Sequence, residues 1–381
     1  MRILHLCNYI QPKLGYQEYF LAKEHAKMGH TVTVVTSDRY FPFPNYDNTV
    51  KAVLGNRFVG IGESFVDGFK IIRLKTIFEN SGRVWLLGLK NTIKQIQPDI
   101  IICHGIPNFN SVRILNLKKK LDFKLIFDDH MVKTYESHRF IGNIFYKLFN
   151  FKKIEKFADR IIGISSECVD FIKEKYRIKK NVELVPLGAD TDLFRPDEDI
   201  KKSFRQKNNI PSEAIVLIYT GKLIFDKAPH NIILALDKIK NKITKEVILL
   251  FVGNFETQYK EYFYSLVEKT NFKIIHFPSV NNKELANFFI GADIAIWPRQ
   301  ITISTIEASS CGIPIICSQK YKERFKNNNG IPIKEDDIDN LSDAILLLIE
   351  DDKLRENMGQ NGRNLVLNEM SWAAIAKNFI E

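Results

Sequence analysis

The chain has 381 residues, of which 45% are hydrophobic and 26% are charged, a composition typical of folded proteins rather than of disordered chains. This length exceeds one ordinary core and suits two domains of under about 200 residues each. The formal net charge is +10, but the lysines form no dense basic block and no nucleic-acid-binding motif is present, so the charge indicates only a weak preference for anionic partners.

The sequence shows no sign of export or of membrane insertion. No apolar run approaches the ~20 residues that span a bilayer. Residues 1–6 read as a buried strand and lack the features of a signal peptide. The five cysteines are scattered without a CxxC pair: Cys7, Cys103, Cys168, Cys311 and Cys317. We therefore expect a cytoplasmic protein without disulfides and without a zinc site. We also expect no cofactor.

The first half alternates short β-branched runs with helical stretches, which indicates a parallel sheet covered by helices. Strands are predicted at residues 3–6, 31–36, 100–103, 125–127, 161–164 and 183–185. A helix is predicted over residues 17–28, with Gly29 as its stop. This half reads as one doubly wound domain over residues 1–187.

A second series of the same kind follows a turn-rich joint at residues 186–192. Its strands are predicted at residues 216–220, 247–252, 272–275, 294–297 and 314–317, with helices near 231–240, 259–269, 283–291 and 304–311. This second domain covers residues 188–365. In the tail, Trp372, Ile375 and Phe379 share one helix face, so residues 366–381 should form a helix that docks on another element.

Ligands of such sheets bind beyond the carboxyl ends of the strands. The loop after the first strand, residues 8–18, contains Gly15 but no GxGxxG motif, which argues against a dinucleotide cofactor. At the end of a later strand, His130 is suited to hydrogen-bond a hydroxyl or a charged intermediate. A polar loop start is the simpler explanation of His130 from the sequence alone.

Two stretches of the second half suit a phosphorylated ligand. Lys222 and Lys227 follow a strand and precede a helix, where two cations suit a pyrophosphate, although loop lysines are often merely solvated. After the strand that ends at Trp297, the amides of Ser304, Thr305 and Ile306 open a helix and could hold phosphate oxygens, while Glu307 could accept ribose hydroxyls. An ordinary helix with one acidic residue near its start fits the same pattern.

Taken in order, these segments resemble family 4 of the retaining glycosyltransferases, which have the GT-B architecture, over nearly the whole chain. The segments that carry the resemblance are residues 14–18, 29–32, 158–162, 185–194, 221–227, 306–308 and 312–314. The resemblance implies an α/β fold of two Rossmann-like, doubly wound domains facing a central cleft, with a C-terminal helix crossing back to the first domain. It also implies a nucleotide-sugar donor, bound without a metal ion, and a glycan or lipid-linked acceptor.

The resemblance assigns roles to individual residues. Lys222 and Lys227 would hold the diphosphate and Glu307 the ribose. Gly15 would allow a close approach of the first loop to the donor, and His130 would lie beside the transferred sugar. The family's other motif glutamate is replaced here by Arg299, which would pair with an acidic sugar or with the diphosphate, mark a subfamily variation, or signal lost activity.

The sequence specifies neither the acceptor nor the base of the donor. Residues 138–153 mix large apolar and basic side chains and could lie on an anionic inner membrane face, although a partly buried helix explains them as well. A sugar-nucleotide epimerase and a non-catalytic nucleotide-binding homologue are the alternative functions. Nothing in the sequence distinguishes uridine, guanosine and adenosine donors.

Overall fold

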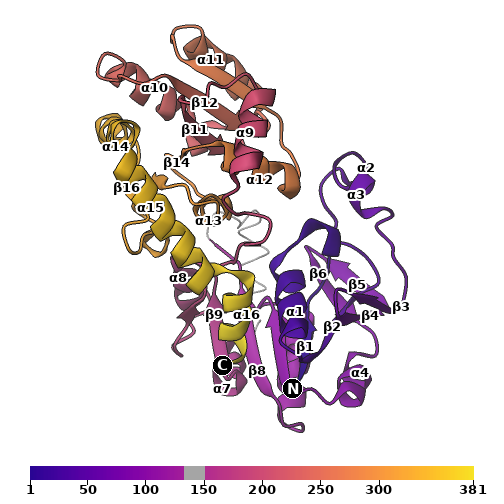
Figure 1. The fold of residues 1–381 in the computed structure, drawn as a ribbon. Helices are drawn as coiled ribbons and strands as arrows, with labels where there is room; N and C mark the ends of the chain where they lie inside the picture. The colour runs from indigo at the N-terminus through magenta and orange to yellow at the C-terminus, as the bar shows by residue number, and fades with distance from the viewer. Residues whose placement is uncertain (133–150) are drawn as a thin grey trace. The chain divides into compact units, whose positions relative to one another are not determined.

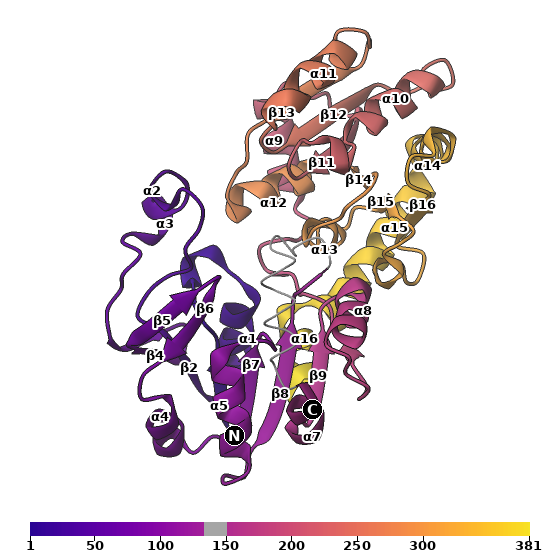
Figure 2. The same cartoon turned by 180° about the vertical axis from the view of Figure 1, so that it is seen from behind.

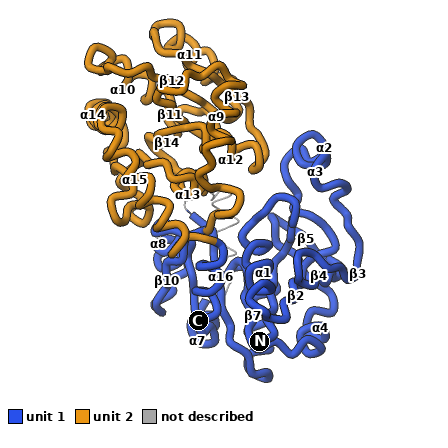
Figure 3. The backbone as a smooth tube through the Cα atoms, in the orientation of Figure 1, with its two compact units in different colours: residues 1–187, 372–381 blue, residues 188–371 orange. Residues whose placement is uncertain are grey.

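The structure is a computed structural model of the chain, and it describes residues 1–132 and 151–381. The chain forms two compact units, unit 1 with residues 1–187 and 372–381 and unit 2 with residues 188–371 (Figure 3). The last helix, α16 (Trp372–Ile380), belongs to unit 1. The expected docking segment is shorter than residues 366–381, because η5 (Val366–Met370) continues helix α15 (Asp352–Leu365) within unit 2.

Unit 1 is built on an eight-stranded sheet in the order β10-β9-β8-β7-β1-β2-β4-β3, parallel except at β3 (Figure 1). Its strands are β1 (Arg2–Leu6), β2 (Thr31–Ser37), β3 (Gly62–Val66), β4 (Phe69–Leu74), β7 (Ile100–His104), β8 (Lys124–Asp129), β9 (Arg160–Gly163) and β10 (Glu183–Leu184), and a separate antiparallel ribbon pairs β5 (Thr76–Asn80) with β6 (Arg83–Leu86). Its other helical elements are η1 (Pro12–Leu14), α1 (Gln17–Lys27), α2 (Tyr46–Thr49), α3 (Lys51–Leu54), α4 (Leu89–Ile96), α5 (Phe109–Lys118), α7 (Phe151–Phe157) and α8 (Ser166–Lys175).

The two faces of this sheet bury different side chains. Alternate residues such as Leu4, Cys103 and Phe127 join the hydrophobic cluster that includes residues of α4, α5, α7 and α8. The intervening residues point to the opposite face. Helices α1 and α16 lie on that face in Figure 1, whereas α5 lies on the other face, which Figure 2 shows from behind. This alternation places the polar His5 and Asp128 in the interface between the sheet and the helices of that second face.

Helix α16 is anchored at both ends within unit 1. The ring of Trp372 stacks on Phe20 of α1, with ring centroids 5.0 Å apart and planes within 8°. At the other end, Arg160 donates to the carbonyl oxygen of Phe379 at 3.0 Å and Lys124 to that of Ile380 at 3.2 Å. Cations at a helix C-terminus satisfy its last carbonyl groups and complement its dipole. Stacking and capping together hold α16 against α1.

Unit 2 has a six-stranded sheet with all neighbouring strands parallel, in the order β13-β12-β11-β14-β15-β16. Every residue of β11 (Ile215–Thr220) and β12 (Val247–Val252) is buried, as expected for parallel strands covered on both faces. The remaining strands are β13 (Lys273–Phe277), β14 (Ile294–Trp297), β15 (Ile315–Ser318) and β16 (Gly330–Ile333). The helices are α9 (Glu198–Lys207), η3 (Phe225–Lys227), α10 (His230–Ile239), α11 (Thr257–Val267), α12 (Asn282–Gly291), α13 (Ser304–Ser310), η4 (Lys322–Arg324) and α14 (Ile338–Glu350), with α15 and η5.

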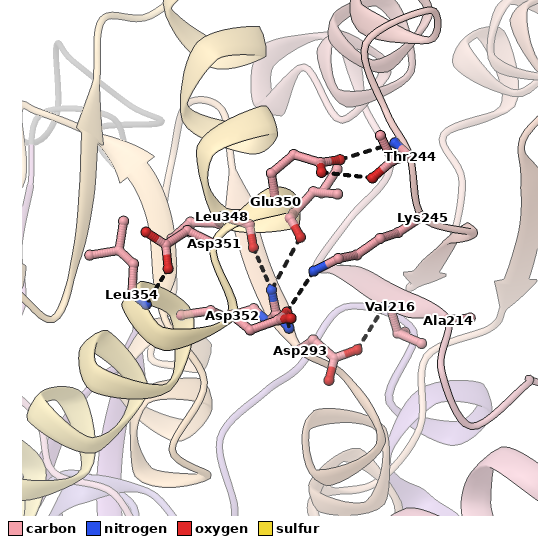
Figure 4. Close-up of polar contacts among 12 residues, drawn as sticks. Ala214, Val216, Thr244, Lys245, Asp293, Leu348, Glu350, Asp351, Asp352 and Leu354 are labelled. Atoms are coloured by element: carbon pink, nitrogen blue, oxygen red, sulfur yellow. Dashed lines mark hydrogen bonds and ion pairs between the residues drawn. The ribbon is translucent and has the colours of Figure 1, made fainter.

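Polar contacts fix the amino-terminal edge of this sheet (Figure 4). Glu350, at the end of α14, accepts from the amide and the hydroxyl of Thr244, at 3.1 and 2.8 Å, just before β12. Lys245 pairs with Asp352 at 2.7 Å, and Asp293 accepts the amide of Val216 at 2.8 Å. These contacts are structural, because they lie at the edge opposite the carboxyl ends of the strands.

The eleven strands predicted from the sequence are all present, each within two residues of the expected bounds. Strands β3 to β6 and β16 were not predicted. All five cysteines are buried and free. In the part of the chain that the structure describes, no helix has the length and apolarity needed to cross a membrane.

Candidate functional site

In unit 1 the strand order reverses between β1 and β7, which is where open α/β sheets bind ligands. The loop after β1 turns at Gly15, which has φ of 65°, in the left-handed region that favours glycine. A Cβ at Gly15 would lie 3.0 Å from the ring of Phe20. The turn into α1 therefore favours glycine at this position, and the approach of this loop to a donor stays a prediction.

His130 follows β8 at the same carboxyl edge and is tied to Asp128. Its Nε2 lies 3.2 Å from Oδ2 of Asp128, and the same oxygen lies 3.1 Å from Nδ1 of His104. Asp128 is fully buried, whereas 43% of the His130 side chain is exposed. The buried carboxylate thus orients an imidazole whose other edge remains available to a ligand.

The acids around His130 differ in the direction in which their pKa values are shifted. Burial opposes ionisation of Asp128, but the adjacent His104 and His130 outweigh it and hold the pKa of this carboxyl well below its usual range. Burial raises the pKa of Asp129 and of Glu18. Burial would lower the pKa of His130, but the hydrogen bond and the charge of Asp128 overcome this effect and raise it. Asp128 is therefore the acid that governs His130.

In unit 2 the strand order reverses between β11 and β14, and both following loops carry candidate residues. The β11 loop passes through Gly221, φ 138°, against Gly253, φ 154°. A Cβ at Gly253 would lie only 1.8 Å from the carbonyl oxygen of Gly221, so this contact requires glycine. The packing fixes the start of the loop that carries Lys222 and Lys227.

The two lysines of this loop lie close enough to repel each other. Burial and then the charge of Lys222 lower the pKa of Lys227. Within residues 1–132 and 151–381, neither ammonium group has a carboxylate partner within ion-pair distance. Neighbouring cations without a counter-charge attract an anion such as a diphosphate.

Glu307 of α13 is buried, with 5% of its surface exposed, and its Oε2 has no hydrogen-bond partner within the described residues. Burial raises the pKa of its carboxyl to about 7, against a smaller opposing effect of Ser304. An unpartnered buried acceptor costs about 1–3 kcal/mol, so ligand hydroxyls that donate to it would remove a penalty.

The helix start near Glu307 offers fewer free amides than the sequence suggests. The amides of Thr305 and Ile306 already donate to the carbonyls of Thr302 and Ile303, at 3.3 and 2.8 Å. The amide of Ser304 lies 3.3 Å from the hydroxyl oxygen of Thr302, a long contact that a ligand could replace. The predicted phosphate contacts of Thr305 and Ile306 thus lack free donors, because the turn uses these amides itself.

Arg299 lies in a pair that the sequence did not predict. Its Nε and Nη2 lie 2.8 and 2.6 Å from Oδ1 of Asp336, and its Nη1 donates to the carbonyl of Phe225 at 3.1 Å. Arg299 therefore joins the β11 loop to the loop after β16. Asp336 lies after an unpredicted strand, and a single acid in a loop gives no sequence signal of this pairing.

The remaining expectations concern a membrane face and metals. Of the candidate membrane-binding segment, residues 138–153, residues 138–150 lie outside the described residues. Its residue Phe151, in α7, packs on Tyr176 with ring centroids 4.6 Å apart. In the described ranges no group of three His, Cys, Asp or Glu side chains is arranged to hold a metal ion. Of the candidate residues, Gly15 and His130 lie in unit 1, and those from Lys222 to Glu307 lie in unit 2.

Comparison with family models assigns both units. The model "Glycosyltransferase Family 4" matches residues 19–193, and the model "Glycosyl transferases group 1" matches residues 200–365. The two matches meet near the boundary between the units and together span most of the chain.

Individual relatives are distant. An uncharacterized glycosyltransferase of Methanocaldococcus jannaschii is 27% identical, over 70% of this chain and 68% of its own length. A GDP-mannose-dependent monoacylated alpha-(1-6)-phosphatidylinositol monomannoside mannosyltransferase of Corynebacterium glutamicum is 24% identical, over 58% of this chain and 61% of its own. The crystal structure of Anabaena HepE in complex with UDP and glucose superposes with a TM-score of 0.64 at 14% identity, over 100% of this chain and 98% of that one.

Proposed function

Since this chain belongs to glycosyltransferase family 4 and has the GT-B fold, we propose that it transfers a sugar from a nucleotide-diphosphate sugar to a glycan or lipid-linked acceptor, with retention at the anomeric carbon. The coarser statement, that the chain is a glycosyltransferase of the group 1 type, follows from the family itself.

The observation that carries the proposal is that, within the described residues, unit 2 contains both two unpaired cations and a buried acid with an unsatisfied oxygen. Lys222 and Lys227 supply positive charge without a carboxylate counter-ion among the described residues. Glu307 presents the unpartnered oxygen Oε2 from α13, which follows the strand next to β11. A nucleoside diphosphate offers the complementary groups, with diphosphate oxygens for the lysines and ribose hydroxyls for Glu307.

The proposed chemistry stabilises the leaving group. As the bond between the anomeric carbon and the diphosphate breaks, negative charge grows on the diphosphate, and Lys222 and Lys227 neutralise it without a metal ion. His130, oriented by Asp128, would hold a hydroxyl of the transferred sugar rather than act as a nucleophile. An acceptor hydroxyl that attacks the anomeric carbon from the face that the diphosphate leaves, and passes its proton to the departing diphosphate oxygen, would form the new bond with retention.

The acceptor class is inferred from the relatives. The name of the Corynebacterium relative describes a mannosyltransferase that acts on a phosphatidylinositol mannoside, a lipid-linked glycan. We propose an acceptor of the same broad class, glycan or lipid-linked, bound by unit 1. We also propose that the protein works from the cytoplasm and contacts an anionic face of the inner membrane peripherally.

Isothermal titration of UDP, GDP and ADP into the wild type and into Glu307→Ala tests the donor site. One of the three nucleotides should bind the wild type, and its affinity should fall at least tenfold in the variant, since a hydrogen bond to a charged group contributes about 1.5–3 kcal/mol. Glu356→Ala, on the exposed face of α15, is the matched control and should bind as the wild type does.

Two other results would redirect the assignment. Binding of no nucleotide at millimolar concentration would contradict the donor site. Binding without any transfer or hydrolysis of the sugar would favour a non-catalytic homologue. Arg299 raises this possibility, because it replaces an acid of the family motif and its guanidinium is already paired with Asp336. Formation of an isomerised nucleotide sugar would point to an epimerase.

A further inference from the structure

Behind His130 a row of buried side chains runs through unit 1 to the C-terminal helix. Nε2 of His25 contacts the carbonyl oxygen of Ala376 in α16 at 2.8 Å, and Nδ1 of His25 contacts Nε2 of His5 at 3.0 Å. Nδ1 of His5 contacts Nε2 of His104 at 3.0 Å, and Nδ1 of His104 contacts Asp128 at 3.1 Å. Asp128 then contacts His130 at 3.2 Å.

The rings of this row meet at their edges, as hydrogen bonding requires. The planes of the His5 and His104 rings are 10° from parallel and their centroids are 5.3 Å apart, and the His5 and His25 centroids are 5.2 Å apart. With nitrogens only 3.0 Å apart, such centroid distances place the rings edge to edge rather than face to face. His5 and His25 are fully buried, so water cannot complete their hydrogen bonds.

Counting protons along the row gives a definite result. A carbonyl oxygen and a carboxylate only accept, so His25 must donate to Ala376 and His104 must donate to Asp128. Each of the two contacts between imidazoles also needs one proton. Four contacts therefore need four protons, whereas three neutral imidazoles carry three. The row is complete only with one additional proton.

The additional proton belongs next to Asp128. The polarity set by Ala376 makes Nδ1 of His25 and Nδ1 of His5 acceptors, which leaves Nε2 and Nδ1 of His104 both as donors. A doubly protonated His104 is an imidazolium, and it faces the fully buried carboxylate of Asp128. Opposite charges in contact are the arrangement that a buried ion requires.

We propose that His104, His5 and His25 are positioning residues, which hold one additional proton beside Asp128 and thereby set the orientation and the charge environment of His130. The role of His130 in sugar transfer rests on the proposed function, but the proton row does not depend on it. The carbonyl of Ala376 in α16 fixes the direction in which every hydrogen bond of the row donates. The arrangement therefore depends on the docking of α16 on α1.

The consequence for His130 follows from charge compensation. An imidazolium at His104 offsets the negative charge of Asp128, so His130 meets a partly neutralised carboxylate. If His104 were neutral, the full charge of Asp128 would act on His130. Among the described residues, the other titratable groups facing His130 are Glu18 of α1 and Asp129 of β8, whose carboxyl pKa values are both raised by burial. At the far end of the row, the ring of His30 lies 6.5 Å from that of His25, centroid to centroid.

The test counts imidazole N–H protons by NMR in the full chain labelled with 15N-histidine. Four low-field imidazole protons, protected from exchange with water, are expected for the row in the wild type. His5→Gln should leave three, because the amide can accept from His104, donate to His25 and so preserve the polarity. His5→Leu should leave two, because His104 then needs only the proton facing Asp128. Three such protons in the wild type would overturn the proposal.

A second readout separates positioning from a merely structural role. In His5→Leu, His130 should titrate at a pH higher by about one unit, because His104 is no longer forced to be charged, whereas His5→Gln should titrate as the wild type does. If His130 titrated at the same pH in the wild type and in both variants, the proposal would be overturned. If His5→Leu does not fold, the proton count of the wild type still decides the matter. Absence of glycosyl transfer would contradict the proposed function and leave both NMR results standing.

Discussion

Replacing Glu307 by Gln should stabilise unit 2 above neutral pH and leave its stability unchanged in mild acid. The carboxyl is buried, one of its oxygens has no partner among the described residues, and its pKa is raised from 4.5 to about 7. Between these two values the folded state binds a proton that the unfolded state does not. Stability therefore falls as the pH rises through this window, and the loss is complete above the folded pKa.

The size of the effect follows from the shift. Each pKa unit corresponds to about 1.36 kcal/mol, so a rise from 4.5 to about 7 implies a loss of about 3 kcal/mol once Glu307 is ionised. Gln has nearly the shape of the protonated carboxyl and does not ionise. The difference in unfolding free energy between Glu307→Gln and the wild type should be near zero below about pH 4.5 and about 3 kcal/mol above about pH 8.

Urea unfolding at several pH values measures this difference. Trp297, buried in β14, reports on unit 2 once Trp85 and Trp372, both in unit 1, are replaced by Phe. Glu356→Gln, an exposed change on α15, should show no pH-dependent difference from the wild type. A stability gain in Glu307→Gln that is the same at every pH would refute the reasoning, because it would not arise from ionisation.

Three further changes test the site and its support. His130→Ala should lower kcat by about 10²- to 10⁴-fold with little change in melting temperature, since the side chain is half exposed; an unchanged kcat would remove His130 from the site. Gly253→Ala should destabilise unit 2 by about 1–3 kcal/mol and weaken nucleotide binding in calorimetry, because its Cβ would meet the carbonyl of Gly221; wild-type melting and affinity would contradict this. Trp372→Ala should cost about 3–5 kcal/mol in chemical unfolding of unit 1, since it removes the buried stack on Phe20; a cost below about 1 kcal/mol would mean that α16 does not depend on it.

The fold was largely readable from the sequence because its buried parallel strands are continuous β-branched runs. The runs of β11 and β12 are buried at every position, so their sequences carry the signal on both faces. Strand β3 is an edge strand whose first four residues are exposed, and β16 contains Pro332, so neither resembles a buried strand. Both β3 and β16 lie at the edges of their sheets.

The candidate site was only partly readable. Lys222, Lys227 and Glu307 were predicted as site residues because they follow predicted strands, where parallel sheets bind ligands. The pairing of Arg299 with Asp336 was missed because it joins loops 37 residues apart. Which amides of a helix start remain free depends on turn geometry that no residue type specifies, which is why the phosphate contacts expected of Thr305 and Ile306 lack free donors.

The histidine row was beyond sequence reasoning for a different reason. His5 and His104 lie on neighbouring strands, and the register pairs His104 with Asp128 directly. In the sequence these histidines are isolated polar positions within apolar runs and resemble ordinary core residues. Only the strand register and the docking of α1 bring their rings into contact.

The most direct test of the central claim is proton NMR of the protein incubated with UDP-, GDP- and ADP-linked sugars and a lipid or glycan acceptor extract. The account predicts that one donor is consumed, that its nucleoside diphosphate is released, and that the new glycosidic bond keeps the anomeric configuration of the donor. Lys227→Ala should slow this reaction without unfolding the chain. Turnover with an inverted anomeric centre, or a donor that binds and remains intact with every acceptor, would contradict the account.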